Sequence, residues 1–153
     1  MMKVIMVYTS MTGNTEEIAN AILEGIQEEG IEVEVKEVLD ASADELEAYD
    51  GILLGAYTWG DGELPDDFLD FYDEMDSIHL SGKKAAVFGS CDSGYEKYGA
   101  AVDILVEKLQ ELGAAVVLEG LKIELAPTSE ERESCKQFGK QFVQKMLTEP
   151  STY

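Results

Sequence analysis

The chain has 153 residues, with 32 Asp and Glu against 11 Lys and Arg, so its formal net charge is −21. Nucleic acid and anionic lipid both require clustered basic residues, so we expect neither as a partner and expect basic protein surfaces instead. The first residues hold too short an apolar run for a signal peptide, and no apolar stretch is long enough to span a membrane. A cytoplasmic protein is therefore expected.

The cysteines and the histidine exclude two further classes. Cys91 and Cys135 lie far apart and form no CxxC pair, while the single His79 has no neighbouring His or Cys. Neither a disulfide scaffold nor a metal site is expected. At this length we expect one domain over residues 1–148, followed by a frayed tail over residues 149–153.

Apolar runs and helix-periodic stretches alternate along the chain. Three continuous apolar runs predict strands in the middle of a parallel sheet: residues 4–7, 52–54 and 85–88. Residues 31–35 alternate and predict an edge strand, and residues 116–118 with Leu121 and Ile123 predict a second edge. Five strands are expected.

Between the strands, apolar residues at helical spacing predict four helices, over residues 14–29, 65–75, 98–112 and 129–147. Gly30 and Gly113 follow two of them as C-caps. Thr128 and Glu131 have the spacing of a capping box, and residues 42–49 form a less clear short helix that begins with the same spacing. The alternation predicts an α/β fold with a doubly wound parallel sheet.

A polar turn, Thr9-Ser10-Met11-Thr12-Gly13-Asn14-Thr15, joins the first strand to the first helix. Free N–H groups at a helix start attract anions, and the hydroxyl and amide groups add donors for phosphate oxygens. The turn has no Lys or Arg and lacks the Walker spacing, which argues against a triphosphate. The alternative is an ordinary N-cap at Thr12 or Asn14. The many donors in one turn favour a phosphate monoester.

Ligands of doubly wound sheets bind beyond the carboxyl ends of the strands. The loops after the third and fourth strands, residues 56–63 and 89–98, each contain an aromatic residue beside glycine. Trp59 and Tyr95 could therefore enclose a flat ligand between two rings. The alternative is that Trp59 caps the core and Tyr95 packs on its own helix, but the neighbouring phosphate turn favours the ligand.

These three loops resemble those of the flavodoxin family. The family's phosphate signature, (T/S)-x-T-G-x-T, is matched by residues 10–15, its tryptophan loop by residues 57–61 and its tyrosine loop by residues 92–96. The chain's length and the uninterrupted last strand that we expect resemble those of the family's short-chain branch. The resemblance implies a flavodoxin-like three-layer sandwich with strand order 2-1-3-4-5, and FMN as a non-covalent cofactor.

The resemblance also implies the FMN-binding residues. The phosphate is expected on residues 10–15, with Tyr57 and Thr58 on the phosphate and ribityl side. The isoalloxazine is expected between Trp59 and Tyr95. The full candidate set is Ser10, Met11, Thr12, Gly13, Asn14, Thr15, Tyr57, Thr58, Trp59, Gly60, Ser90, Cys91, Asp92, Tyr95 and Gly99. Backbone groups near Ser90, Cys91, Asp92 and Gly99 are expected to meet the polar edge of the ring. No role is assigned to the Cys91 thiol.

The implied function is that of a low-potential one-electron carrier, cycling FMN between semiquinone and hydroquinone, with no substrate of its own. We expect the Gly60-Asp61 peptide to turn its carbonyl toward flavin N5 on reduction, because glycine has wide conformational freedom. Acidic residues between Asp61 and Asp76 are expected to disfavour the anionic hydroquinone. The expected partners are a basic-surfaced flavodoxin reductase and acceptor oxidoreductases, and the expected state is a monomer.

Two alternatives belong to other classes. A flavodoxin-like FMN reductase, or an activator of ribonucleotide reductase, would share the fold but leave the ring open to substrate, whereas two aromatic residues here are expected to cover it. A phospho-acceptor signalling receiver would need an acidic pair after the first strand and an Asp after the third. Those positions hold Tyr8-Thr9-Ser10 and Ala56-Tyr57.

Overall fold

The computed structural model describes residues 3–10, 13–58, 64–91, 100–124 and 127–147. Within them the strands form one parallel sheet in the order β2-β1-β3-β4-β5, with β6 also beside β4. The strands are β1 (Val4–Tyr8), β2 (Val33–Glu37), β3 (Gly51–Gly55), β4 (Lys84–Cys91), β5 (Ala115–Val116) and β6 (Leu121–Glu124). This order confirms the predicted doubly wound sheet.

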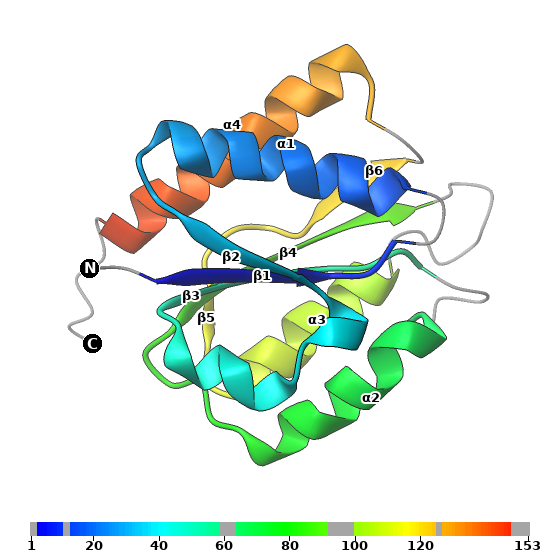
Figure 1. Ribbon diagram of the computed structural model, residues 1–153, viewed down its shortest axis with the longest axis vertical. Helices are drawn as coiled ribbons and strands as arrows, with labels where there is room; N and C mark the ends of the chain where they lie inside the picture. Colours follow the sequence, from blue (N-terminus) through cyan, green and yellow to red (C-terminus); the bar gives the residue numbers. More distant parts are fainter. Residues whose placement is uncertain (1–2, 11–12, 59–63, 92–99, 125–126, 148–153) are drawn as a thin grey trace.

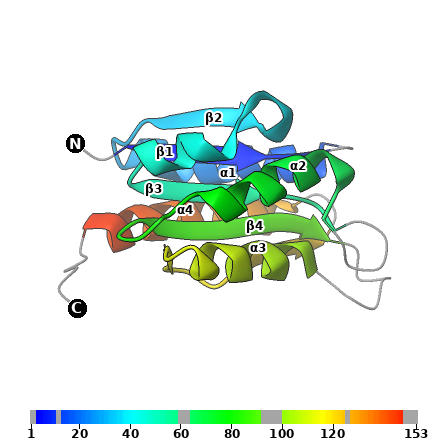
Figure 2. The same cartoon turned by 90° about the horizontal axis from the view of Figure 1, so that it is seen from below.

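Helices cover both faces of the sheet and make three layers (Figures 1 and 2). One face carries α1 (Asn14–Glu28) and α4 (Ser129–Leu147). The other carries α2 (Asp66–Glu74) and α3 (Ala100–Glu111). Three short 3-10 helices complete the described elements: η1 (Val38–Asp40), η2 (Ala43–Ala48) and η3 (Met75–Ser77). The four predicted helices are confirmed within the described residues, with small differences at their ends.

The apolar runs of the central strands face two separate cores. In β1, Ile5 and Val7 pack on the α2–α3 side, whereas Val4, Met6 and Tyr8 pack on the α1–α4 side. All five residues are buried, because a parallel strand with helices on both faces has no solvent side. The continuous apolar runs in the sequence reflect this double coverage.

The two edge strands differ from their predictions. β2 begins at Val33 rather than at residue 31 and extends to Glu37. The last strand is not uninterrupted: Val116 lies beside Ala85 and Leu121 beside Phe88, so the edge uses more residues than β4 over the same length. The intervening residues bulge out, and two short strands, β5 and β6, replace the single predicted one.

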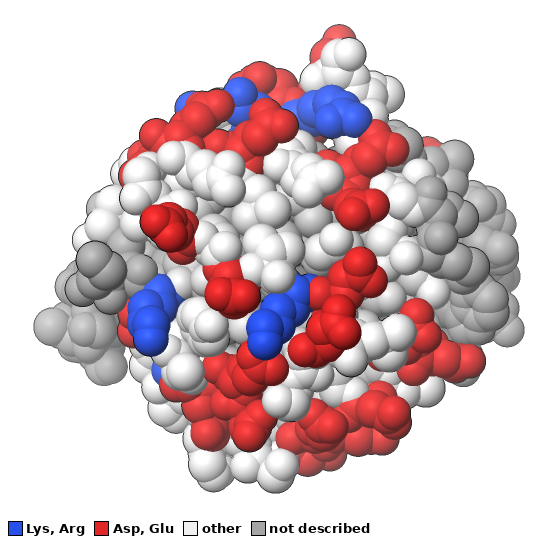
Figure 3. Space-filling model, in the orientation of Figure 1, with Lys and Arg blue, Asp and Glu red and all other residues white. Residues whose placement is uncertain are grey.

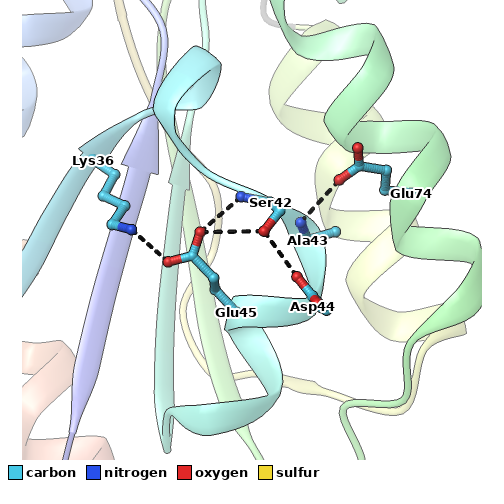
Figure 4. A network of polar contacts seen from close by, with 6 residues as sticks. All are labelled: Lys36, Ser42, Ala43, Asp44, Glu45 and Glu74. Atoms are coloured by element: carbon cyan, nitrogen blue, oxygen red, sulfur yellow. Dashed lines mark hydrogen bonds and ion pairs between the residues drawn. The ribbon is translucent and has the colours of Figure 1, made fainter.

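The short helix predicted before β3 is present and begins with the predicted capping box. The predicted helix over residues 42–49 is the 3-10 helix η2, and it has the expected capping box: Glu45 Oε2 accepts from the Ser42 N–H at 2.8 Å (Figure 4). Glu45 also binds Lys36 of β2, and Glu74 of α2 accepts from the Ala43 N–H at 3.1 Å. These bonds fasten η2 to its neighbours on both sides.

The capping box before α4 is also confirmed. The Thr128 N–H donates to Glu131 Oε1 at 3.0 Å, and the Glu131 N–H donates to Thr128 Oγ1 at 3.2 Å. At the other helix ends, Gly30 and Gly113 have the positive φ angles of C-cap residues, +83° and +99°.

Candidate functional site

The carboxyl ends of β1, β3 and β4 meet at one edge of the sheet, beside the start of α1 (Figure 1). Backbone hydrogen bonds continue past the strand ends. The Ala56 N–H donates to the Phe88 carbonyl at 3.2 Å, and the Thr58 N–H donates to the Ser90 carbonyl at 3.3 Å. The segment after β3 is therefore held against the last residues of β4.

The turn before α1 has a cap that the sequence did not predict. Gly13 is the N-cap residue, in the left-handed region at φ +92°, and Asn14 already lies in the helix, so Asn14 as the cap is wrong. The Ser10 hydroxyl oxygen takes the capping role instead, accepting from the Gly13 N–H at 3.1 Å and from the Glu16 N–H at 3.3 Å. Glycine suits a left-handed residue between Ser10 and the helix.

The start of α1 offers backbone donors. The N–H groups of Asn14 and Thr15 lie in the first turn, where no carbonyl one turn earlier in the helix can accept from them. The two carboxylates of that turn are engaged elsewhere: Glu17 pairs with Arg132 of α4 at 2.6 Å, and Glu16 accepts from the Tyr8 hydroxyl at 3.4 Å. The helix terminus is thus left to attract an anion.

Two buried hydroxyls connect this turn to the end of β4. Thr15 Oγ1 and Ser90 Oγ are 2.9 Å apart, and their residues are only 1% and 6% exposed. The backbones are closely packed here, because a Cβ at Gly89 would lie 2.2 Å from the Ala56 carbonyl oxygen. Two residues that are far apart in the sequence thus share one buried hydrogen bond.

Tyr57 and Thr58 extend the site toward the other helical layer. The Thr58 hydroxyl oxygen accepts from the Ala101 N–H in the first turn of α3 at 3.2 Å. Burial raises the pKa of Tyr57, and the nearby Asp67 and Asp66 carboxylates raise that pKa further. The phenol is therefore neutral and lies close to the acidic start of α2.

Cys91 ends β4 as a buried, neutral thiol. It is 4% exposed, and its sulfur lies 3.8 Å from the Gly89 carbonyl oxygen as a weak donor. Burial raises the pKa of Cys91 to about 11, with smaller influences from Lys122 and Asp103. A thiol with this pKa is protonated at neutral pH and is a poor nucleophile. The Cys135 thiol is also free, and burial raises its pKa to about 11.

Eight of the predicted site residues are described, and they all lie at this edge: Ser10, Gly13, Asn14, Thr15, Tyr57, Thr58, Ser90 and Cys91. The other seven lie outside the described residues: Met11, Thr12, Trp59, Gly60, Asp92, Tyr95 and Gly99. The enclosure of a flat ligand by two rings therefore stays a prediction.

Sequence reasoning missed the polar contacts that surround the turn. Tyr8, Glu16 and Arg132 contribute to it, and the Ala101 N–H fixes the Thr58 hydroxyl. Tyr8 looks like an ordinary strand residue, and Arg132 comes from a helix far along the chain, so no local sequence motif predicts either contact.

Among the described helices, none has the length and apolar character needed to cross a bilayer.

Comparisons with known proteins identify the family. A sequence model of the family described as Flavodoxin matches residues 6–139. The Probable flavodoxin 2 of Bacillus subtilis (strain 168) is 47% identical over 146 residues, which cover 95% of this chain and 97% of that protein. The Flavodoxin of Maridesulfovibrio salexigens is 43% identical over 134 residues, covering 86% and 92%. The crystal structure of oxidised Flavodoxin 1 from Bacillus cereus has a TM-score of 0.91 at 66% identity, covering 93% of this chain and 97% of that chain.

Proposed function

This chain belongs to the flavodoxin family and is an FMN-binding electron carrier rather than an enzyme with its own substrate; from that premise we propose where it holds FMN and how it meets its partners. The phosphate lies against the turn from Ser10 to Thr15, at the start of α1. The observation that carries this proposal is the set of neutral donors converging there.

The described residues fit a phosphate monoester. The N–H groups of Asn14 and Thr15 in the first turn of α1 and the hydroxyls of Ser10 and Thr15 can donate to phosphate oxygens, and helix termini favour such anions. Gly13 keeps the turn tight, since its positive φ angle is costly for other residues. When bound, FMN supplies a ring that takes up and releases electrons one at a time. The protein's own residues bind and orient that group.

The rest of the predicted set belongs to the same proposal. Trp59 and Tyr95 cover the ring, and Gly60 supplies the peptide that adjusts to its protonation. Tyr57 and Thr58 lie on the phosphate and ribityl side, and backbone groups near Ser90, Cys91, Asp92 and Gly99 meet the polar edge. Support comes from Thr58 and Cys91, which lie at the same edge of the sheet as the phosphate turn. Met11 and Thr12 complete the turn itself.

The partners dock, in this proposal, on the acidic outer surface of α2. Four exposed aspartates, Asp66, Asp67, Asp70 and Asp73, have no cation partner among the described residues. Figure 3 shows acidic side chains over much of this face, including its lowest part, where α2 and η2 lie, and the basic side chains of that view lie at the upper edge and near the middle. Such a surface attracts basic redox proteins and repels a second copy of the chain, so a monomer is expected. A cytoplasmic location fits its two free thiols.

An anaerobic reductive titration of the purified chain with added FMN tests the carrier function. Visible bands of bound flavin should appear, and long-wavelength absorbance should rise and then fall as two single electrons enter. Rapid NADPH–quinone turnover by the isolated chain should be absent. Failure to bind FMN would contradict the proposed site, and direct two-electron bleaching would contradict one-electron transfer.

A further inference from the structure

We propose that Ser90 is a positioning residue that orients the Thr15 hydroxyl toward the phosphate of FMN. The inference rests on the proposed placement of the phosphate at residues 10–15, and it assigns a role to the Ser90 hydroxyl, whereas the polar edge of the ring is proposed to meet backbone groups near Ser90. Its basis is the hydrogen bond between Thr15 Oγ1 and Ser90 Oγ, 2.9 Å long and buried from solvent.

Counting hydrogens determines the direction of this bond when phosphate is present. A hydroxyl has one hydrogen to donate and two lone pairs to accept with. If Thr15 donates its hydrogen to a phosphate oxygen, the bond to Ser90 persists only if Ser90 is the donor. Ser90 then donates to Thr15 and Thr15 donates to the phosphate, and each bond polarises the next.

Ser90 is held firmly enough to act in this way. It lies in β4 between β3 and β6, beside Ile123, and its carbonyl accepts from the Thr58 N–H at 3.3 Å. The preceding Gly89 packs directly against the Ala56 carbonyl. The backbone that carries the Ser90 hydroxyl is therefore fixed. Water has little access to take the place of this hydroxyl, because the residue is 6% exposed.

Ser90→Ala should leave the Thr15 hydroxyl in place but without its donor. The hydroxyl would rotate among several directions, and the oxygen would lose a hydrogen bond in a dry site. The loss concerns phosphate alone, since Thr15 is expected on the phosphate turn and not at the ring. Affinity for FMN should fall roughly 3- to 10-fold. Affinity for riboflavin, which lacks the phosphate, should change less than about 2-fold.

The test is a double-mutant cycle on the apoprotein. Dissociation constants for FMN and for riboflavin are measured by flavin fluorescence quenching in wild type, Ser90→Ala, Thr15→Val and the double variant. Thr15→Val keeps the buried volume and removes the hydroxyl, and should lower FMN affinity roughly 10- to 100-fold. In that background Ser90→Ala should have no further effect on the ratio of FMN to riboflavin affinity, because its target is gone.

Each other result overturns the proposal in a recognisable way. If Thr15→Val leaves the ratio unchanged, the phosphate is not on this turn and the proposed site fails as well. If Thr15→Val lowers the ratio but Ser90→Ala does not, only the positioning role fails. Equal losses of FMN and riboflavin in Ser90→Ala would assign Ser90 to the ring or to the fold. Ser134→Ala, on the exposed face of α4, is the matched control, and thermal melts of each apoprotein check folding.

Discussion

The two helical layers use their acidic residues differently. On the α1–α4 layer, two acidic side chains of α1 are paired with cations of α4: Glu17 with Arg132 at 2.6 Å, and Glu28 with both Lys136 and Lys140 at 2.9 Å. On α2, the four exposed aspartates have no such partner among the described residues. A strongly acidic composition thus serves helix pairing on one side and leaves an unneutralised surface on the other.

The backbone packing follows the same division. α1 and α4 touch through glycines, since a Cβ on Gly25 would lie 2.0 Å from the Lys136 carbonyl oxygen and one on Gly139 would lie 2.3 Å from that of Ile22. α2 instead contacts the core through larger side chains, Phe68 and Phe71. The α1–α4 layer therefore packs closely behind the turn that precedes α1, while α2 presents its charged face to solvent. In the function that we propose, partner docking and phosphate binding therefore involve different layers.

The largest expected effect comes from forcing α1 and α4 apart. Gly25→Ala places a methyl group against a helix backbone that cannot move alone, and should lower the free energy of unfolding by about 2 to 4 kcal/mol. In an exposed helix the same change would be stabilising by roughly 0.5 to 1 kcal/mol, so the sign is informative. Urea unfolding of the apoprotein measures it. Asn20→Ala, exposed on α1, is the control, and a stable Gly25→Ala would contradict the close packing.

The second-largest effect distinguishes the acidic residues of α2 from those of the α1–α4 layer by the rate at which a partner protein associates. The triple variant Asp66→Asn, Asp70→Asn and Asp73→Asn should slow association with a basic-surfaced flavodoxin reductase about 10-fold at low salt, because long-range attraction is lost. Stopped-flow electron transfer at several salt concentrations measures the rate. The difference from wild type should shrink as salt rises.

A charge-matched control lies on the other layer. Replacing Glu17, Glu28 and Glu133 by Gln removes the same charge from the α1–α4 side, where the first two are already paired with cations. Association should slow much less than in the α2 variant. Equal slowing by both variants would show that net charge alone governs docking, and would contradict an α2 docking surface.

A smaller effect concerns Lys108, a buried cation behind the acidic helix. Its Nζ bonds Asp76 and lies 4.6 Å from the centre of the Tyr72 ring, so it ties α3 to α2 and η3. Lys108→Met should lower the free energy of unfolding by about 1 kcal/mol at neutral pH. Urea unfolding checks this, with association rates expected to change little.

The pH dependence of that loss follows from the direction of the pKa shift. The bond to Asp76 raises the pKa of Lys108 above its ordinary value of 10.5. The stabilisation is therefore complete below that ordinary value and is lost as pH rises through the higher folded-state pKa. The difference between wild type and Lys108→Met should narrow at strongly alkaline pH. A constant difference would mean that packing of the side chain, not its charge, was responsible.

The smallest effect is expected at the ion pair of the phosphate turn. Arg132 and Glu17 have side chains that are 48% and 42% exposed, so their bond should contribute less than about 0.5 kcal/mol. A double-mutant cycle of Arg132→Gln and Glu17→Gln in urea measures the coupling. It should disappear in high salt. A coupling that survives salt would mean that the pair is more than a surface contact.

The sequence predicted the central elements better than the edges. Residues 4–7, 52–54 and 85–88 stand out because strands covered on both faces need apolar side chains throughout. At the edges that constraint is absent, and the start of β2 and the division between β5 and β6 escaped prediction. Edge strands have one free side, so bulges and shifted ends are tolerated there.

The site shows the same limit at the level of single contacts. The motif around Gly13 indicated a phosphate turn, because the residue types themselves carry the chemistry. The sequence could not show that Ser10 caps α1 in place of Asn14, since both are good cap residues and only the path of the turn distinguishes them. The motif identified the hydrogen-bonding residues, and the tertiary structure determined which of them caps the helix.

By itself, then, the order of apolar runs, polar turns and glycines determined the doubly wound sheet, the acidic character and the family of this protein. Only the tertiary structure decided which acids are paired and that Thr15 meets Ser90. Periodicity and motifs act between neighbours in sequence and can be seen there. Charge pairing and buried hydrogen bonds depend on distances between segments far apart in the chain, and those distances exist only once the helices have packed on the sheet.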